Sequence, residues 1–281
     1  MPQPPAELDL TVADVHRLVA SQHPSLLGPV RRVAHGWDND LFRLGDDLAV
    51  RLPRRASAAP LVVHEQRWLP LLAPLVPVAV PVPVAVGVPE GAYPWHWSIV
   101  PWFEGVNALD LAPPVRDGFA AQLGGILRRL HVAAPADAPF NPVRAVPLAD
   151  RDTAVRPRLA AVPALVPVWE EALAAPAHEG PPVWVHGDPH PGNMLVGGDG
   201  LISALLDFGD VSAGDPASDL AIAWLGFTAT GRDAFRSAVN TDAATWARAR
   251  GWAAAIAALL HDAEDPGLRA MSAHGVGELT R

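Results

Sequence analysis

His186-Gly187-Asp188-Pro189-His190-Pro191-Gly192-Asn193 is the stretch that says most about the fold of this chain, and Asp207-Phe208-Gly209 begins fourteen residues after its end. In phosphoryl-transfer sites an aspartate orients a hydroxyl group and accepts its proton, while an asparagine oxygen and a second carboxylate hold magnesium ions. Asp188, Asn193 and Asp207 have the residue types and the order that such a site needs. A solvated turn explains Asp188 equally well when it is taken alone, but the whole set favours the catalytic interpretation.

The residues around this stretch predict how its polar side chains meet. A short apolar strand precedes it, so Asp188 lies just past a strand end, where loops carry functional groups. Residues 194–196 and 201–206 are apolar and are separated by a Gly-Gly-Asp-Gly turn, which predicts a β-hairpin. Asn193 opens this hairpin and Asp207 closes it, so we expect the two side chains to converge.

The composition indicates a packed globular protein. Half of the 281 residues are hydrophobic and the mean hydropathy is +0.16, which allows a sizeable core. The chain has no cysteine, so it has no disulfide framework and no thiolate metal site. Its net charge of −9 argues against nucleic-acid binding, because neutralising phosphates needs clustered positive charge.

The ends and the charge distribution predict a location and a kind of partner. The N-terminus lacks the basic start and apolar core of a signal peptide. The apolar run 71–88 contains four prolines, which exclude an uninterrupted membrane helix. We therefore expect a cytoplasmic protein with no membrane partner. Residues 105–281 carry 13 arginines against 20 aspartates and glutamates, and this acidity favours a cationic partner through long-range attraction.

The secondary-structure pattern changes near Gly105. Before it, residues 29–52 read as strands joined by turns, and helices are predicted at 11–20 and 61–72. After it, apart from the hairpin, the pattern is helical, and no helix is predicted past residue 260. The helices predicted there cover 115–132, parts of 153–175, 217–229, 232–239 and 243–260. We predict an α+β fold with two units, residues 1–104 and residues 105–281.

The motifs resemble those of the aminoglycoside phosphotransferase family, the antibiotic-kinase branch of the protein-kinase-like fold. The pattern H-G-D-x-H-x-x-N, then an apolar hairpin and D-F, is similar to that family's signature, and residues 214–221 (G-D-P-A-S-D-L-A) resemble a second family segment. The resemblance covers residues 30 to 260 approximately. It implies a β-sheet N-lobe that binds the nucleotide and a mostly helical C-lobe. It also implies transfer of the γ-phosphoryl group of ATP, with GTP possible, to an antibiotic hydroxyl with Mg²⁺, and a role in antibiotic resistance.

The resemblance assigns roles to residues of the second unit. Asp188 is expected to be the catalytic base, and Asn193 and Asp207 the magnesium ligands. Loop support is expected of His186, His190 and Asp219. Asp215 is expected to shape the acceptor cleft. The carboxylates near the C-terminus fit an acidic acceptor pocket, although a solvated terminus accounts better for them: Asp262, Glu264, Asp265 and Glu278.

In the first unit the same resemblance points to the nucleotide. Gly36 and Asn39 lie where the family has its nucleotide-positioning loop, although a plain hairpin turn fits them equally well, and a single glycine is not a Walker cradle. Arg51 takes the place of the kinase lysine, since all 21 basic residues of the chain are arginine, and Glu65 resembles its helix partner. The backbone of the lobe connection is expected to bind the nucleotide base through Val100 and Trp102, with Ile99 as the gatekeeping side chain.

Alternatives remain at this point. The acceptor of the antibiotic kinase is expected to be an aminoglycoside-like cationic compound, but a macrolide or a cyclic peptide fits as well. The same fold also serves metabolic kinases acting on choline, homoserine, a sugar or a fructosamine. The missing lysine keeps an inactive nucleotide-binding pseudokinase in consideration. A metal-dependent hydrolase built on His186, Asp188, His190 and Asp207 is less favoured, because no H-E-x-x-H pair supports it.

Overall fold

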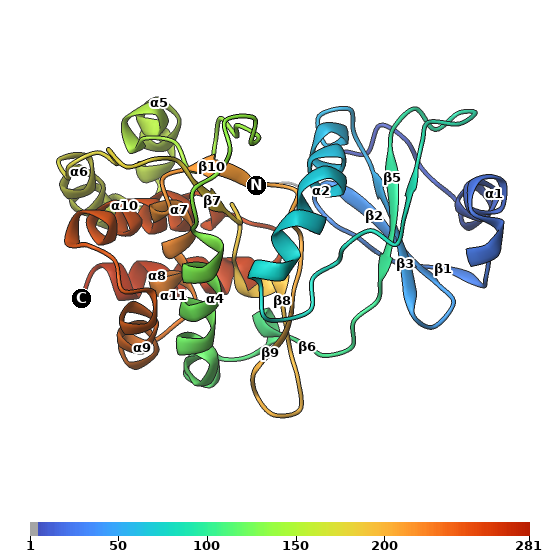
Figure 1. Ribbon diagram of the computed structural model, residues 1–281. Coiled ribbons are helices and arrows are strands. Elements are labelled where there is room, and N and C mark those ends of the chain that lie inside the picture. The colour runs from blue at the N-terminus through green and yellow to red at the C-terminus, as the bar shows by residue number, and fades with distance from the viewer. Residues whose placement is uncertain (1–4) are drawn as a thin grey trace. The chain divides into compact units, whose positions relative to one another are not determined.

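The computed structural model (Figure 1) describes residues 5–281, apart from the side chains of residues 34 and 35, and they form two compact units. One unit comprises residues 5–74 and 79–104, and the other comprises residues 75–78 and 105–281. The boundary expected from the sequence lies between the same two residues, 104 and 105. The assignment of nucleotide binding to one unit and catalysis to the other stays a prediction.

The first unit is built on a five-stranded antiparallel sheet with the strand order β1-β2-β3-β5-β4. A tight turn with Gly45 in the left-handed region (φ 60°) joins the second and third strands, which pair from Leu44 and Leu48 outward. The strands are β1 (Val30–His35), β2 (Asn39–Leu44), β3 (Leu48–Pro53), β4 (Ala85–Gly87) and β5 (Trp97–Pro101).

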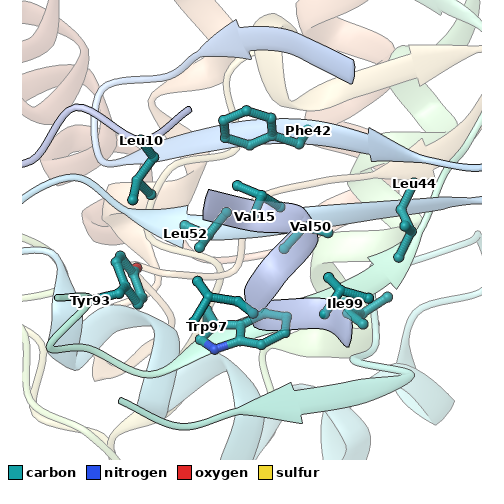
Figure 2. Close-up of a cluster of buried hydrophobic side chains, with 11 residues drawn as sticks. Leu10, Val15, Phe42, Leu44, Val50, Leu52, Tyr93, Trp97 and Ile99 are labelled. Atoms are coloured by element: carbon teal, nitrogen blue, oxygen red, sulfur yellow. The ribbon is translucent and has the colours of Figure 1, made fainter. Parts of the chain in front are cut away.

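Helix α1 (Val12–Gln22) supplies the apolar cover for one face of this sheet. Its start is set by a capping box, in which Thr11 Oγ1 accepts from the N–H of Asp14 and the Asp14 carboxylate accepts from the N–H of Thr11. Val15, Leu18 and Val19 of this helix are buried. Figure 2 shows the resulting core, in which residues of the N-terminal segment and the helix meet sheet side chains: Leu10, Val15, Phe42, Leu44, Val50, Leu52, Tyr93, Trp97 and Ile99.

Helix α2 (Ala59–Leu72) lies on the opposite side of the sheet from α1 (Figure 1). Strand side chains alternate between the two faces, so Val50 and Leu52 join the core under α1 while Arg51 between them is directed the other way. Gln66 of α2 donates to Ser98 Oγ of β5 at 3.0 Å, which ties the helix to that face. The period of the strand therefore sets which face carries a charge.

The second unit is helical with two small sheets. One sheet has the order β6-β8-β9 and the other pairs β10 with β7. The strands are β6 (Val106–Asn107), β7 (Val183–Val185), β8 (Met194–Val196), β9 (Ile202–Leu205) and β10 (Ser212–Gly214). The longer helices are α4 (Ala120–Leu130), α5 (Leu148–Leu159), α6 (Val166–Leu173), α9 (Ala229–Val239), α10 (Ala243–Leu260) and α11 (Pro266–Leu279); the short ones are α3 (Pro113–Arg116), α7 (Ala217–Leu220) and α8 (Ile222–Leu225).

Short single-turn 3-10 segments join several of these elements. They are η1 (Pro24–Leu26), η2 (Ala73–Leu75), η3 (Ala108–Asp110), η4 (Asp117–Phe119), η5 (Pro163–Leu165) and η6 (Pro191–Asn193). The last of these falls inside the motif of the second unit, so the proline and glycine there form a compact turn. Of the described helices, none is both long and apolar enough to cross a membrane.

Close helix packing explains one of the two adjacent glycines in α4. A β-carbon added to Gly124 would lie 2.7 Å from the carbonyl oxygen of Phe235 and 2.9 Å from the β-carbon of Ala238, both on α9. Gly125 would meet nothing within 4 Å. Close contact with α9 therefore accounts for Gly124 but not for Gly125.

The sequence predicts no helix past residue 260, but residues 266–279 form helix α11. Asp265 caps this helix, and Ser272 donates to the Ala257 carbonyl of α10 at 2.7 Å. Met271 and Leu279 are buried. Three glycines weaken the apolar helix pattern here, and one of them, Gly275, allows close approach to Leu225. The helix depends on tertiary packing more than on its own sequence pattern.

Candidate active site

The motif loop of the second unit is held from below by one buried carboxylate. Asp219 of α7 accepts from the backbone N–H groups of His186 and Gly187, at 2.8 and 2.9 Å, and faces His131 Nε2 at 3.0 Å. Burial by itself raises the pKa of Asp219, but the hydrogen bond and charge of His131, with His186 and the Gly187 N–H, bring it below its ordinary value. The Asp219 carboxylate therefore stays ionised and fixes the loop backbone, as loop support requires.

His186 links the two halves of the motif. Its Nδ1 accepts from the Asp188 N–H at 3.2 Å, so Nε2 carries the proton and donates to the Leu206 carbonyl at 3.0 Å. Its ring is fully buried and packs against Phe208, with ring centroids 4.6 Å apart. One imidazole thus sets the backbone before Asp188 and the backbone before Asp207.

The Asp188 carboxylate is about one-third exposed and lies between two basic side chains. Its Oδ2 is 3.7 Å from His190 Nε2, and its Oδ1 is 3.5 Å from Arg144. His190 Nδ1 accepts from the Gly192 N–H at 3.0 Å, which leaves the ring proton on Nε2, facing Asp188. This geometry orients the carboxylate without covering it.

The structure brings Asn193 and Asp207 to the same end of the hairpin. The Leu206 N–H donates to the Asn193 carbonyl at 2.8 Å, which continues the β8–β9 pairing to the residue before Asp207. Asn193 Nδ2 donates to the Asp188 carbonyl at 2.9 Å. Asp207 has a left-handed backbone (φ 59°), an uncommon conformation for a residue other than glycine. The three predicted residues therefore belong to one hydrogen-bonded unit.

These residues fit a magnesium ion by the chemistry of their donor atoms. Since Nδ2 of Asn193 is turned to the Asp188 carbonyl, its Oδ1 lies on the other side of the amide, and Asp207 adds carboxylate oxygens. Mg²⁺ prefers such hard oxygen ligands and takes the rest of its shell from water and phosphate. Among the side chains that the structure describes, which exclude that of His35, no group of three or more His, Cys, Asp or Glu residues is arranged to hold a metal ion.

Sequence reasoning missed three residues of this site. Asp210 directly follows the D-F-G triplet, and its position was the only signal available. Asn141 and Arg144 come from the irregular segment between α4 and α5, where no periodic pattern marks them. Asn141 Nδ2 donates to Asp210 Oδ1 at 2.9 Å, and Arg144 Nε lies 3.6 Å from Asp210 Oδ2. Burial, with the charges of Asp188 and Asp207, raises the pKa of Asp210 against the lowering effect of Arg144 and Asn141.

The expected role of Asp215 in the acceptor cleft does not fit its position. The side chain is buried, and Arg248 of α10 holds it with two contacts, Nε to Oδ2 at 2.6 Å and Nη2 to Oδ1 at 3.1 Å. The N–H of Ala217 also donates to it, at 3.0 Å. This arrangement corrects the prediction: Asp215 joins α7 to α10 and is not placed to meet an acceptor.

We expect Asp215→Ala to destabilise the fold by about 3–5 kcal/mol, because it leaves the buried Arg248 guanidinium without its partner. The measurement is chemical denaturation followed by circular dichroism. Asp199→Ala, at an exposed turn, is the control and should change the unfolding free energy little. A weaker acceptor affinity with unchanged stability would restore the original assignment.

The C-terminal carboxylates have local roles in the structure. Asp265 Oδ1 caps α11 by accepting from the Leu268 N–H at 2.9 Å. Asp262 is largely exposed, with His261 Nε2 3.8 Å away, and Glu264 is exposed, with its carbonyl accepting from Arg269. The capping by Asp265 corrects its expected role, and the exposure of the other two fits the solvated alternative better than an enclosed pocket.

In the first unit, Arg51 and Glu65 form a close ion pair. Arg51 Nη1 lies 2.6 Å from Glu65 Oε1, with side chains 11% and 1% exposed, respectively. Because Glu65 is buried on α2, the arginine is held on the α2 face of the sheet. The predicted pairing of these two residues is present, with a guanidinium where kinases have a lysine.

The segment 36–39 forms a tight turn. The Gly36 N–H donates to the Asn39 carbonyl at 2.8 Å, and Arg54 Nη1 donates to the Gly36 carbonyl at 2.9 Å. Arg55 forms an ion pair with Asp38. Both arginines follow β3, so the turn is tied to the strand that carries Arg51. Nucleotide binding by Gly36 and Asn39 stays a prediction.

Of the backbone groups expected to bind the nucleotide base, at least one already has a hydrogen-bond partner within the protein. Val100 is buried in β5 opposite Ala49, and Ile99 is fully buried. The Trp102 N–H donates to the Asp47 carbonyl at 2.8 Å, so this donor is already engaged. The prediction is corrected for that N–H group, because the turn after β2 folds back onto it. Base binding by the remaining backbone groups stays a prediction.

An antiparallel sheet with a paired arginine and glutamate, and a helical unit with an aspartate, an asparagine and a second aspartate, together define a phosphotransferase of the protein-kinase-like α+β fold. The sequence matches the model of a family described as the phosphotransferase enzyme family (APH) over residues 29–252. The chain therefore belongs to this family, and it is a phosphotransferase. The resemblance, the fold class and the enzyme class that the sequence predicts are confirmed.

Solved structures support the fold over nearly the whole chain. The GDP complex of wild-type aminoglycoside 2'-phosphotransferase-IIIa is 17% identical, with a TM-score of 0.72 over 96% of this chain and 97% of that chain. An ADP-bound aminoglycoside phosphotransferase is 17% identical, with a TM-score of 0.63 over 96% and 97%. The apoenzyme of macrolide 2'-phosphotransferase from Brachybacterium faecium is 24% identical, with a TM-score of 0.63 over 94% and 97%. No curated protein matches the sequence.

Proposed function

We propose that this phosphotransferase moves the γ-phosphoryl group of ATP, or of GTP, to a hydroxyl group of a cationic, aminoglycoside-like antibiotic. The observation that carries this proposal is the position of Asp188. Its carboxylate is oriented by neighbouring side chains, is partly open to solvent, and lies in one hydrogen-bonded unit with Asn193 and Asp207. The proposal includes a cytoplasmic location and a role in antibiotic resistance.

The chain's own residues account for the positions that the reaction needs. Asp188 accepts the proton of the acceptor hydroxyl. The oxygen of that hydroxyl forms a bond to the γ-phosphorus, and the bond from the γ-phosphorus to the nucleoside diphosphate breaks as the diphosphate leaves. Asn193 and Asp207 are the residues that would hold Mg²⁺, which neutralises charge on the phosphates when it is bound. Asp219 and His186 keep the loop backbone fixed, so little reorganisation is needed when the acceptor arrives.

Two findings support the substrates. Among proteins of the same fold, one was solved with GDP and another with ADP, which supports a purine nucleotide for this chain. One was solved with GDP and kanamycin. Within this chain, three carboxylates form one cluster around a single arginine: the charges of Asp188 and Asp207 both raise the pKa of Asp210, and Arg144 lies near Asp188 and Asp210. This cluster favours an acceptor with positive charge.

A macrolide is the second candidate acceptor. Two proteins of the same fold are macrolide 2'-phosphotransferases, 24% and 21% identical to this chain, and their names support this candidate. A panel of acceptors separates it from an aminoglycoside.

The deciding experiment is mass spectrometry for a phosphate adduct. The purified protein is incubated with Mg²⁺ and ATP, or GTP, and with kanamycin, gentamicin, streptomycin, a macrolide or a cyclic-peptide antibiotic. An adduct on one antibiotic class, absent with Asp188→Asn, supports the proposal and names the class. Adducts only on choline, homoserine or sugars would replace it with a metabolic kinase. Nucleotide binding without any transfer would indicate a pseudokinase, and stoichiometric zinc would favour a hydrolase.

Arg51 should be needed for nucleotide affinity. Charged hydrogen bonds contribute about 1.5–3 kcal/mol, so we expect Arg51→Ala to weaken nucleotide binding by about 10–100-fold. Arg51→Lys should recover only part of this, because an ammonium lacks the planar fork that can hold Glu65 and a phosphate at once. Isothermal titration calorimetry measures the affinity, and Arg67→Ala, an exposed arginine of α2, is the control. Unchanged affinity in Arg51→Ala would remove Arg51 from the nucleotide site.

A further inference from the structure

The segment between α4 and α5 places one arginine against two aspartates of the site. Arg144 Nη2 lies 3.5 Å from Asp188 Oδ1, and Arg144 Nε lies 3.6 Å from Asp210 Oδ2. The arginine side chain is 19% exposed, so most of it is enclosed. A single guanidinium thus bridges the expected catalytic base and a carboxylate that follows the D-F-G triplet.

The backbone on both sides of Arg144 is tied to strand β10 and to the residue after it. The Ala213 N–H donates to the Pro139 carbonyl at 3.1 Å, and the Asp215 N–H donates to the Ala145 carbonyl at 2.9 Å. A β-carbon added to Gly214 would lie 2.1 Å from that same Ala145 carbonyl oxygen, so the two chains are in close contact. The segment is anchored at each end, and Arg144 lies beside one anchor.

Backbone strain at Ala145 also belongs to this arrangement. Ala145 is buried and has φ 54°, in the left-handed region that residues with a β-carbon rarely adopt. Such a conformation costs about 1–3 kcal/mol and persists only where the surrounding structure imposes it. Here the contacts with Gly214 and Asp215 impose it. The strained residue directly follows Arg144, so it belongs to the same anchored stretch of backbone.

Asp210 is itself held from two sides. Asn141 donates to Asp210 Oδ1 at 2.9 Å, and the same amide accepts from the Val143 N–H at 2.9 Å, which shapes the segment. On the other side, a β-carbon added to Gly187 would lie 2.4 Å from the Asp210 carbonyl oxygen, and Gly187 has φ 89°. Asp210 therefore packs against Gly187, the residue that precedes Asp188. Arg144 contacts both aspartates and so links them through their side chains.

We propose that Arg144, anchored by Asp210, is a positioning residue that holds the Asp188 carboxylate in the orientation it needs to receive the acceptor hydroxyl. Arg144 occupies Oδ1, so Oδ2 is the oxygen left for the hydroxyl proton, with His190 3.7 Å away. Arg144 acts through Asp188 and not on the nucleotide. This inference rests on the proposed function for its kinetic consequence, but the bridge itself can be tested without a reaction.

The kinetic test uses Arg144→Ala with the antibiotic acceptor that the wild-type protein phosphorylates. A displacement of about 1 Å at a reacting group can cost about 100-fold in rate, so we expect kcat to fall on that order while nucleotide affinity is unchanged. Arg144→Lys should recover part of the rate, and added guanidinium ion should recover part of it in Arg144→Ala. The matched control is Arg156→Ala, an exposed arginine on α5 with surface ion pairs. Wild-type kcat in Arg144→Ala, or a loss that follows stability and that neither lysine nor guanidinium relieves, would overturn the proposal.

The second test is a double-mutant cycle in the unfolding free energy for Arg144→Ala and Asp210→Asn. Residues in contact are non-additive, so we expect the double variant to be less destabilised than the sum of the single variants. If the two single changes in the unfolding free energy add up to that of the double variant, Arg144 and Asp210 are not coupled and the proposed bridge is overturned. If the wild-type protein phosphorylates none of the acceptors tested, the proposed function fails while this cycle still decides whether the bridge exists.

Discussion

Asp188→Ala is expected to lower the rate of phosphoryl transfer by at least about 10²–10⁴-fold, the usual contribution of a general base. The carboxylate is the group that the loop is built to present, and its removal leaves the backbone contacts of His186 and Asn193 in place. Affinity for the nucleotide should therefore survive. Steady-state kinetics with a coupled assay for the nucleoside diphosphate, and calorimetric titration of the nucleotide, measure the two quantities separately.

Asp188→Asn serves as the isosteric variant for this prediction, because it keeps the side-chain volume and loses the base. It should be as inactive as the alanine variant. Asp199→Ala removes an exposed carboxylate from the turn of the same hairpin and should leave the rate unchanged. If either Asp188 variant turns over like the wild type, Asp188 is not the base and the site assignment fails.

Asp219→Ala is expected to lower the free energy of unfolding by about 2–6 kcal/mol. Each buried donor left without an acceptor costs about 1–3 kcal/mol. The substitution orphans the N–H groups of His186 and Gly187 and removes the partner of His131. Urea denaturation of the purified variants measures the loss. Asp233→Ala, an exposed aspartate on α9, is the control, and an Asp219→Ala protein as stable as this control would contradict the role of Asp219.

The pH dependence of stability provides an independent check on Asp219. Its pKa is lower in the folded state than the ordinary value of 3.8, so the unfolded chain binds this proton more readily. The stabilisation by Asp219 is therefore complete above pH 3.8 and is lost as the pH falls through the lower, folded-state value. In that acid range the wild type should lose stability more steeply than Asp219→Asn. Equal slopes would show that this carboxylate is not stabilised by folding.

Much of the site was predictable because its residues are local in the sequence. Asp188 and Asn193 share one loop, and a single hairpin brings Asp207 back to them. Hairpin geometry depends on turn residues and on apolar alternation, both of which are visible in one sequence. The pairing of Arg51 with Glu65 was predicted from the family resemblance, and the alternation of side chains along β3 explains why Arg51 lies on the face of the sheet that carries α2.

What could not be predicted depends on contacts between distant segments. Asp215 is a carboxylate in a family motif, so its residue type suggests a site residue. Only the position of α10 shows that Arg248 neutralises its charge. The same holds for Trp102, whose N–H meets the turn after β2, and for α11, whose glycine-rich sequence becomes a helix by packing on α10. Irregular segments such as residues 139–145 carry no period from which the positions of Asn141 and Arg144 could be inferred.

The amino-acid sequence by itself determined the class of chemistry, the α+β fold and the residues of the motif loop, because short-range spacing is enough to specify a hairpin and its flanking carboxylates. Only the tertiary structure decided which charges are buried in ion pairs and which are exposed to solvent. The physical reason is that the cost of burying a charge depends on its partner, and partners such as Arg248 for Asp215, or Arg144 for Asp188, come from segments more than thirty residues away.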